Sequence, residues 1–114
     1  MNTFGVNAIA RYLVSARSTA GIREAFAWAK QKGLRAIALG RGSNVLFIGD
    51  IEGLVVHIAS RGLVVSHKSE TRAIVQVSAG EPWQGIVDWA CKNGYGGIEN
   101  LSCIPGSAGG AAVQ

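Results

Sequence analysis

Two apolar periodicities follow each other along the chain and predict a mixed α+β fold. The segments 12–16 and 36–40 are short apolar runs typical of buried strands. Between them, apolar residues at helical spacing predict one apolar helix face, made by Ile22, Ala25, Phe26 and Ala29. Ser18 or Thr19 can cap this helix, and Gly33 suits the position just after its end. A strand, a helix and a strand with short connections predict two parallel strands.

The second half of the chain is richer in β-branched residues. Runs at 53–59, 62–67 and 73–79, joined by short polar links, predict an antiparallel meander. In the third run Ile74, Val75 and Val77 do not alternate cleanly, which predicts a strand buried in part on both faces. A second helix is predicted over 82–93, with Pro82 in its first turn, Gly94 after its end and an apolar face of Trp83, Ile86, Val87, Ala90 and Cys91. We therefore expect a β-α-β unit over 1–52, followed over 53–114 by a meander, a helix and a second glycine-rich loop.

Composition narrows the class of protein. The chain has 114 residues, 48% hydrophobic and 16% charged, so we expect one folded domain or slightly less. Its formal net charge is +4, but the basic residues are spread from Arg11 to Lys92 without a run, so no nucleic-acid partner is expected. No segment resembles a signal peptide or a membrane span, which predicts a cytoplasmic protein with no membrane partner.

Cysteine and histidine do not have the spacing of a metal site. Cys91 and Cys103 stand alone, and His57 and His67 have no third ligand beside them. We therefore predict no metal, exposed strand histidines and buried, reduced thiols.

Glycine is the unusual residue, with 16 copies, about double its average share. One cluster, residues 40–44 (GRGSN), joins two apolar stretches, 36–39 and 45–48, that both resemble strands. It fits neither the dinucleotide fingerprint, because Val45 replaces the last glycine, nor the phosphate-binding P-loop. Gly40 and Gly42 can turn successive N–H groups inward as an anion-binding nest, with Ser43 and Asn44 as added donors. An ordinary connection between two strands explains the same pattern equally well.

A second stretch of little bulk covers residues 104–112 (IPGSAGGAA). Pro105 stiffens its start, and Gly106, Gly109 and Gly110 remove side chains. Two such loops in one small domain suit a long, flat ligand with phosphates at one end and a ring at the other. A flexible terminus is the alternative, although such a terminus is more often polar.

Four segments together resemble the N-terminal part of the UDP-N-acetylenolpyruvoylglucosamine reductase family: NTFG (2–5), LGRGSNVLF (39–47), AGEPW (79–83) and GIENLSCIPGSAGGAAVQ (97–114). The resemblance implies an FAD-binding domain of the PCMH or vanillyl-alcohol-oxidase type, incomplete at its C-terminus. It also implies an NADPH- and FAD-dependent oxidoreductase that makes UDP-N-acetylmuramate for peptidoglycan. The partners would then be small molecules: FAD, NADPH and a UDP-sugar.

The resemblance also implies which residues hold the cofactor. It places the FAD pyrophosphate at Gly40, Arg41, Gly42, Ser43 and Asn44. It places the flavin ring near Ile104, Gly106, Ser107 and Gly109, with Gly80 as a further backbone contact. Arg41 either helps to neutralise the diphosphate or is a solvated loop residue.

No catalytic residue is expected within this chain. In the family that the chain resembles, the catalytic arginine, serine and glutamate map beyond residue 114, and so does the substrate domain. We therefore expect a truncated chain that is inactive by itself. The alternative is a stand-alone, non-catalytic module that binds a flavin or nucleotide, or an inactive remnant.

Overall fold

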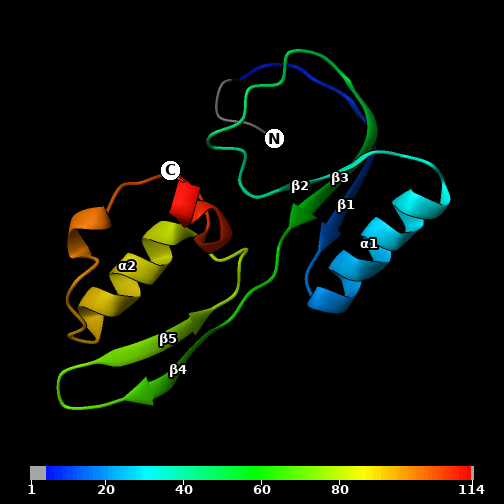
Figure 1. Cartoon of the computed structure of the whole chain (residues 1–114). Coiled ribbons are helices and arrows are strands. Elements are labelled where there is room, and N and C mark those ends of the chain that lie inside the picture. Colours follow the sequence, from blue (N-terminus) through cyan, green and yellow to red (C-terminus); the bar gives the residue numbers. More distant parts are fainter. Residues whose placement is uncertain (1–4, 114) are drawn as a thin grey trace.

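The computed structural model describes residues 5–113. They form two parts, which the short link 59–62 joins (Figure 1). The strands are β1 (Ala10–Ala16), β2 (Ala36–Leu39), β3 (Ile51–Ile58), β4 (Leu63–Lys68) and β5 (Ala73–Val77). The helices are α1 (Thr19–Gln31) and α2 (Trp83–Lys92), with 3-10 helices η1 (Glu99–Leu101) and η2 (Ala108–Val113). The radius of gyration is 16.3 Å, above the roughly 13 Å of a compact domain of this length. The molecule is therefore elongated, and residues 2–4 and 114 of the segments quoted above lie outside the described residues.

The first part is a three-stranded parallel sheet in the order β1-β3-β2, with α1 beside it (Figure 1). Val55 of β3 lies opposite Leu13 on one side and Ile37 on the other. The core between the sheet and α1 is small, and its fully buried members are Ala16, Ala29, Leu54 and Val56.

The ends of α1 are those that the sequence predicts. The Ser18 side chain accepts a hydrogen bond from the N–H of Gly21 at 3.1 Å, and Gly33 has a φ of +65°, the left-handed conformation that ends a helix. The predicted apolar face is correct except at Phe26, which is 37% exposed. Trp28 packs against the core in its place and meets the Tyr12 ring edge-on, with ring centroids 5.2 Å apart.

The expected antiparallel meander is wrong in its first strand. β3 pairs in parallel with both β1 and β2, so the two strands of the predicted β-α-β unit are parallel but not adjacent. Residues 53–56 are all buried, as a central strand of a parallel sheet requires. The short link after β3 does not return the chain beside it and instead leads into the second part. The division of the chain at residue 52 stays a prediction, and β3 spans it.

The expected strand over 45–48 is also absent. The chain between β2 and β3 has no regular structure beyond turns and bends. Leu46 and Ile48 are 60% and 98% exposed, whereas Val45 and Phe47 are half-buried. No strand within residues 5–113 pairs with this apolar run. A strand needs such a partner for its backbone groups, and apolar composition alone does not supply one.

The second part consists of the β4–β5 hairpin and α2 (Figure 1). The hairpin is antiparallel as predicted. However, β5 alternates between half-buried and exposed residues, with Ile74 60% exposed, so it is not buried on both faces. α2 buries Ile86, Val87 and Ala90 as predicted, whereas Cys91 is exposed. Across residues 5–113, neither helix combines the length and the apolar character needed to cross a bilayer.

Candidate functional site

The two glycine-rich loops meet in space, although they lie more than 60 residues apart in the sequence. The first loop, 40–44, follows directly on the C-terminal end of β2. The second, 104–112, lies next to the start of α2. The Ser43 hydroxyl donates to the carbonyl oxygen of Pro105 at 3.3 Å, which joins one loop to the other.

Missing side chains make this approach possible. A Cβ atom added at Gly40 would lie 2.8 Å from the Ser107 hydroxyl oxygen, closer than real Cβ contacts come. Gly42 is buried and has a φ of +70°, a left-handed conformation that favours glycine. The sequence therefore needs glycine at these two positions for reasons of local structure, whatever the loop binds.

The second loop is held mainly through its backbone. The N–H of Ala108 donates to the carbonyl oxygen of Glu81, and the N–H of Gly109 donates to that of Ala79, both at 2.9 Å. The backbone N–H of Trp83 donates to the carbonyl oxygen of Gly106 at 3.1 Å. The segment 79–83 and the second loop thus form a short ladder, which explains how a stretch with so few side chains keeps a defined shape.

A cavity of about 330 Å³ lies between the loops, within the usual range for a small-molecule site. Its lining is Ala38, Leu39, Gly40, Arg41, Gly42, Ser43, Asn44, Val45, Ile58, Ala79, Ser107, Gly109 and Gly110. Ser107 is only 5% exposed, and Arg41 is the one charged residue among these. Because no carboxylate belongs to this lining, the cavity is electrostatically suited to an anion.

Most of the predicted binding residues line this cavity, but three do not. The whole of 40–44 and also Ser107 and Gly109 face it. Gly80 lines a neighbouring hollow of about 270 Å³ that shares Arg41 with the first cavity. Ile104 and Gly106 line neither of the two.

Gly80 has a packing reason of its own. A Cβ atom there would lie 2.5 Å from the carbonyl oxygen of Ser60 and 2.8 Å from that of Ile58. Its N–H also donates to the Ser60 hydroxyl at 3.3 Å. The close approach of two backbones therefore accounts for this glycine without any ligand.

Six lining residues were not predicted, namely Ala38, Leu39, Val45, Ile58, Ala79 and Gly110. Four of them directly flank predicted loop residues, so extending each loop by a residue or two would have found most of them. Ile58 comes from the end of β3 and gave no local signal. It lies there because β3 occupies the centre of the sheet, which the sequence did not indicate.

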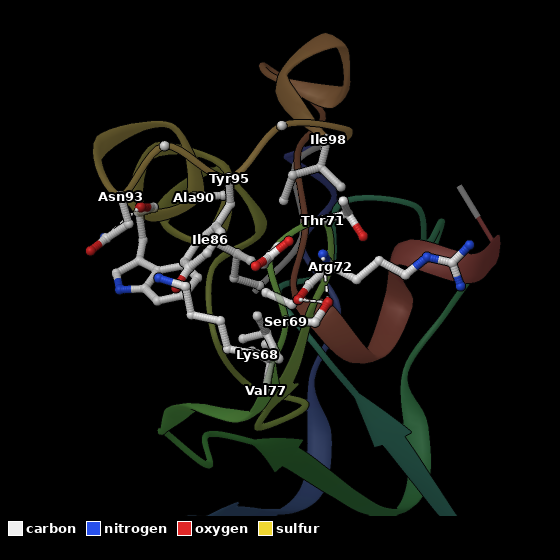
Figure 2. Close-up of a pocket in the computed structure, with 16 residues that line it drawn as sticks. Lys68, Ser69, Thr71, Arg72, Val77, Ile86, Ala90, Asn93, Tyr95 and Ile98 are labelled. Carbon is white, nitrogen blue, oxygen red and sulfur yellow. Dashed lines mark hydrogen bonds between the residues drawn. The ribbon is translucent and has the colours of Figure 1, made fainter.

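A larger cavity of about 490 Å³ lies elsewhere, between the hairpin and α2. Figure 2 shows Lys68, Thr71 and Arg72 on the hairpin side of it and Ile86 and Ala90 on the helix side. Apolar residues of β5 and α2 form its walls, and the polar turn 68–72 lies at one end. No glycine loops bring backbone close together in this lining. We therefore take the smaller cavity, between the two glycine-rich loops, as the candidate site.

None of the histidines or cysteines lines the cavity between the two loops. His57 pairs with the Ser15 hydroxyl, 3.1 Å from its Nδ1 atom, and His67 lies on β4. Cys91 and Cys103 are both exposed, so the expectation of buried thiols is wrong. Cys91 lies on the exposed side of α2, and Cys103 lies in the exposed turn after η1, so neither side chain packs into a core. No group of three or more potential metal ligands occurs within residues 5–113.

One carboxyl group near the second loop has a shifted pKa. Glu99 begins η1, and its carboxylate accepts a hydrogen bond from the N–H of Gly97. Hydrogen bonds from the backbone N–H groups of Glu99 itself and of Gly97 hold the pKa of Glu99 below its ordinary value of 4.5. The charged carboxylate therefore stabilises the turn that leads toward the second loop.

Comparison with known proteins agrees with an FAD site. A family model described as an FAD binding domain matches residues 10–114. Curated relatives called UDP-N-acetylenolpyruvoylglucosamine reductase are 44% identical in Pseudomonas putida and 42% identical in Pseudomonas aeruginosa, each over 99% of this chain and 33% of the relative. A relative of the same name in Amoebophilus asiaticus is 36% identical over the whole chain and 34% of its own length. The chain thus spans about a third of the length of the curated relatives it matches.

Proposed function

The chain belongs to the FAD binding domain family, and from this premise we propose that its two glycine-rich loops hold FAD for a reductase like its relatives. The observation that supports this most is the cavity between residues 40–44 and 107–110. It joins small residues, a buried hydroxyl and one arginine on segments distant in sequence. A simple turn after β2 would not require a second glycine-rich loop packed against it.

The proposed roles follow from the chemistry of the lining. A diphosphate is a compact dianion, and glycine backbone lets it approach main-chain N–H groups closely. In this proposal Gly40 and Gly42 provide that approach, Ser43, Asn44 and Ser107 provide polar donors, and Arg41 neutralises charge. Ile104, Gly106 and Gly109 remain predicted neighbours of the flavin end, and Gly80 a predicted further contact.

The proposed reaction is that of the relatives. When bound, FAD supplies hydride-transfer chemistry, with NADPH as the donor and UDP-N-acetylglucosamine enolpyruvate as the acceptor. We assign no catalytic role to any residue of this chain, whose own contribution is to bind and orient the cofactor. A cytoplasmic location, and partners limited to these small molecules, belong to the same proposal.

A non-catalytic flavin or nucleotide module is the second candidate. The observation that favours it is that the two glycine-rich loops already meet around a cavity within these residues. Both candidates require FAD binding, and only the first requires turnover of NADPH and the enolpyruvyl sugar nucleotide.

Quenching of flavin fluorescence during titration tests the shared step. Gly42→Asp places a carboxylate at a buried, left-handed position in the first loop, and we expect no FAD binding. Gly49→Asp is the matched control, because Gly49 is exposed and a Cβ atom there meets nothing within 4 Å. Arg41→Gln changes an exposed side chain and should keep the fold, so it tests what the positive charge alone contributes to FAD binding.

The expected pattern is specific to the phosphates. Arg41→Gln weakens FAD binding by roughly tenfold, as the loss of one charge-assisted hydrogen bond does, and leaves riboflavin binding unchanged. Equal FAD affinity in Gly42→Asp, Arg41→Gln and unaltered protein contradicts the proposed site.

A further inference from the structure

Side chains at the start of α2 make hydrogen bonds to the segment that leads into the second glycine-rich loop. The Trp83 indole N–H donates to the carbonyl oxygen of Leu101 at 2.8 Å. The next side chain, Gln84, contacts the two residues that follow Leu101 in the chain. The two side chains thus bind three consecutive residues, 101–103, just before the loop begins.

Gln84 makes four hydrogen bonds through its side-chain amide group, the longest of which runs from the Ser102 hydroxyl to Oε1 at 3.4 Å. Its Nε2 donates to the Asp88 carboxylate at 2.7 Å and to the Ser102 hydroxyl at 3.2 Å. Its Oε1 accepts from the backbone N–H of Cys103 at 2.6 Å. Because a carboxylate only accepts hydrogen bonds, Asp88 selects the amide orientation that turns Oε1 toward Cys103.

The residue that Gln84 holds is in an unfavourable conformation. Cys103 is the one non-glycine residue with a positive φ, +63°, within residues 5–113. Side chains disfavour this region, so it persists where neighbouring contacts fix it. The hydrogen bond from Gln84 reaches the N–H of that residue, three positions before Gly106 and four before Ser107.

We propose that Gln84 is a positioning residue: held by Asp88, it fixes the turn at Cys103 and thereby sets the second glycine-rich loop against the first. Gln84 does not line the cavity, so its effect on a ligand passes through the loop. The consequence for FAD affinity rests on the function proposed above, whereas the consequence for the loop does not.

Amide hydrogen exchange of the whole chain tests the effect on the loop. The reporters are the N–H groups of Ala108 and Gly109, which are bonded to backbone carbonyl groups of segment 79–81. In Gln84→Ala we expect them to exchange about threefold to tenfold faster, the effect of losing one hydrogen bond. Amides of β3 serve as the internal reference and are expected to stay unchanged. Gln76→Ala, which removes an exposed glutamine from β5, is the matched control.

A charge swap separates positioning from simple packing. Gln84→Glu alone places two carboxylates side by side, one turn apart, and should also speed exchange. Adding Asp88→Asn places an amide N–H donor at position 88 opposite the new carboxylate at position 84. The other oxygen of that carboxylate can still accept from the N–H of Cys103. We expect the double variant to regain most of the protection at Ala108 and Gly109.

FAD titration of the same variants gives the second measurement. Gln84→Ala should weaken FAD binding by about the factor by which exchange rises, and the double variant should recover it. Unaltered exchange at Ala108 and Gly109 in Gln84→Ala, or no recovery in the double variant, overturns the role of Gln84. Failure of the unaltered chain to bind FAD contradicts the proposed function instead, and leaves the exchange result to decide the role of Gln84.

Discussion

Replacing Gly40 by alanine tests directly whether the two loops are packed as the structure shows. The added Cβ atom would lie 2.8 Å from the Ser107 hydroxyl oxygen, whereas ordinary contacts begin near 3.4 Å. Ser107 is 5% exposed, so its hydroxyl has little room to turn away. Either Ser107 or the loop at residue 40 must therefore move by several tenths of an ångström.

The expected cost follows from two opposing effects. Overpacking a tight site costs typically 1–3 kcal/mol. Gly40 does not have a positive φ, so alanine restricts the unfolded chain and returns about 0.4–1 kcal/mol. We expect the free energy of unfolding to fall by up to about 2.6 kcal/mol. Gly49→Ala, with nothing within 4 Å of its Cβ position, should show the favourable effect alone.

Urea unfolding of four proteins measures this coupling: unaltered chain, Gly40→Ala, Ser107→Ala and the double variant. Ser107→Ala removes the oxygen atom that the new methyl group meets. In that background Gly40→Ala should cost nothing or stabilise slightly, as Gly49→Ala does. A Gly40→Ala cost that is the same with and without the Ser107 hydroxyl refutes the close approach of the two loops.

Three further predictions concern the parts that support the site. Gly85 lies exposed within α2 and a Cβ atom there meets nothing within 4 Å, so Gly85→Ala should raise the free energy of unfolding by about 1 kcal/mol, measured in urea. Ile86 is buried, so Ile86→Asp should abolish cooperative thermal unfolding; a melt like that of the unaltered chain would show that α2 buries another face. Since the folded-state pKa of Glu99 is lowered from 4.5, its carboxylate stabilises the fold above the unfolded pKa and loses this effect as pH falls through the folded pKa. The stability difference between unaltered protein and Glu99→Gln should therefore shrink below about pH 4.5, and a difference independent of pH would contradict the assignment.

Local signals in the sequence were sufficient for the helices and the hairpin. Ser18 and Gly33 mark the ends of α1 because a cap and a left-handed glycine act within one turn of the helix. The apolar spacing of Ile86, Val87 and Ala90 fixes the buried face of α2 for the same reason.

The sheet order depended on contacts that no local pattern encodes. A short link after β3 favoured an antiparallel return, but β3 is central and pairs with strands on both sides. The apolar run ending at Ile48 resembled a strand, yet no strand within residues 5–113 pairs with it. Pairing depends on where the rest of the chain is, and a single sequence does not supply that information.

The candidate site shows the same division. The glycines of both loops were visible in the sequence, and the family resemblance linked them to one ligand. Their contact through Ser43 and Pro105 depends on the tertiary arrangement. Gln84 had no signal at all, because an amide on the first turn of a helix is an ordinary surface residue until its partners are known.

Amide chemical shifts of the chain during FAD titration show whether the ligand enters the cavity between the loops or the larger cavity between the hairpin and α2. We predict that the largest shifts fall on Gly40–Asn44 and Ser107–Gly110, at the cavity between the loops. Riboflavin, which lacks the diphosphate, should shift the first loop much less. Shifts concentrated on 68–72 and 93–96, around the larger cavity in Figure 2, or no shifts in either loop, would contradict an FAD site between the two loops.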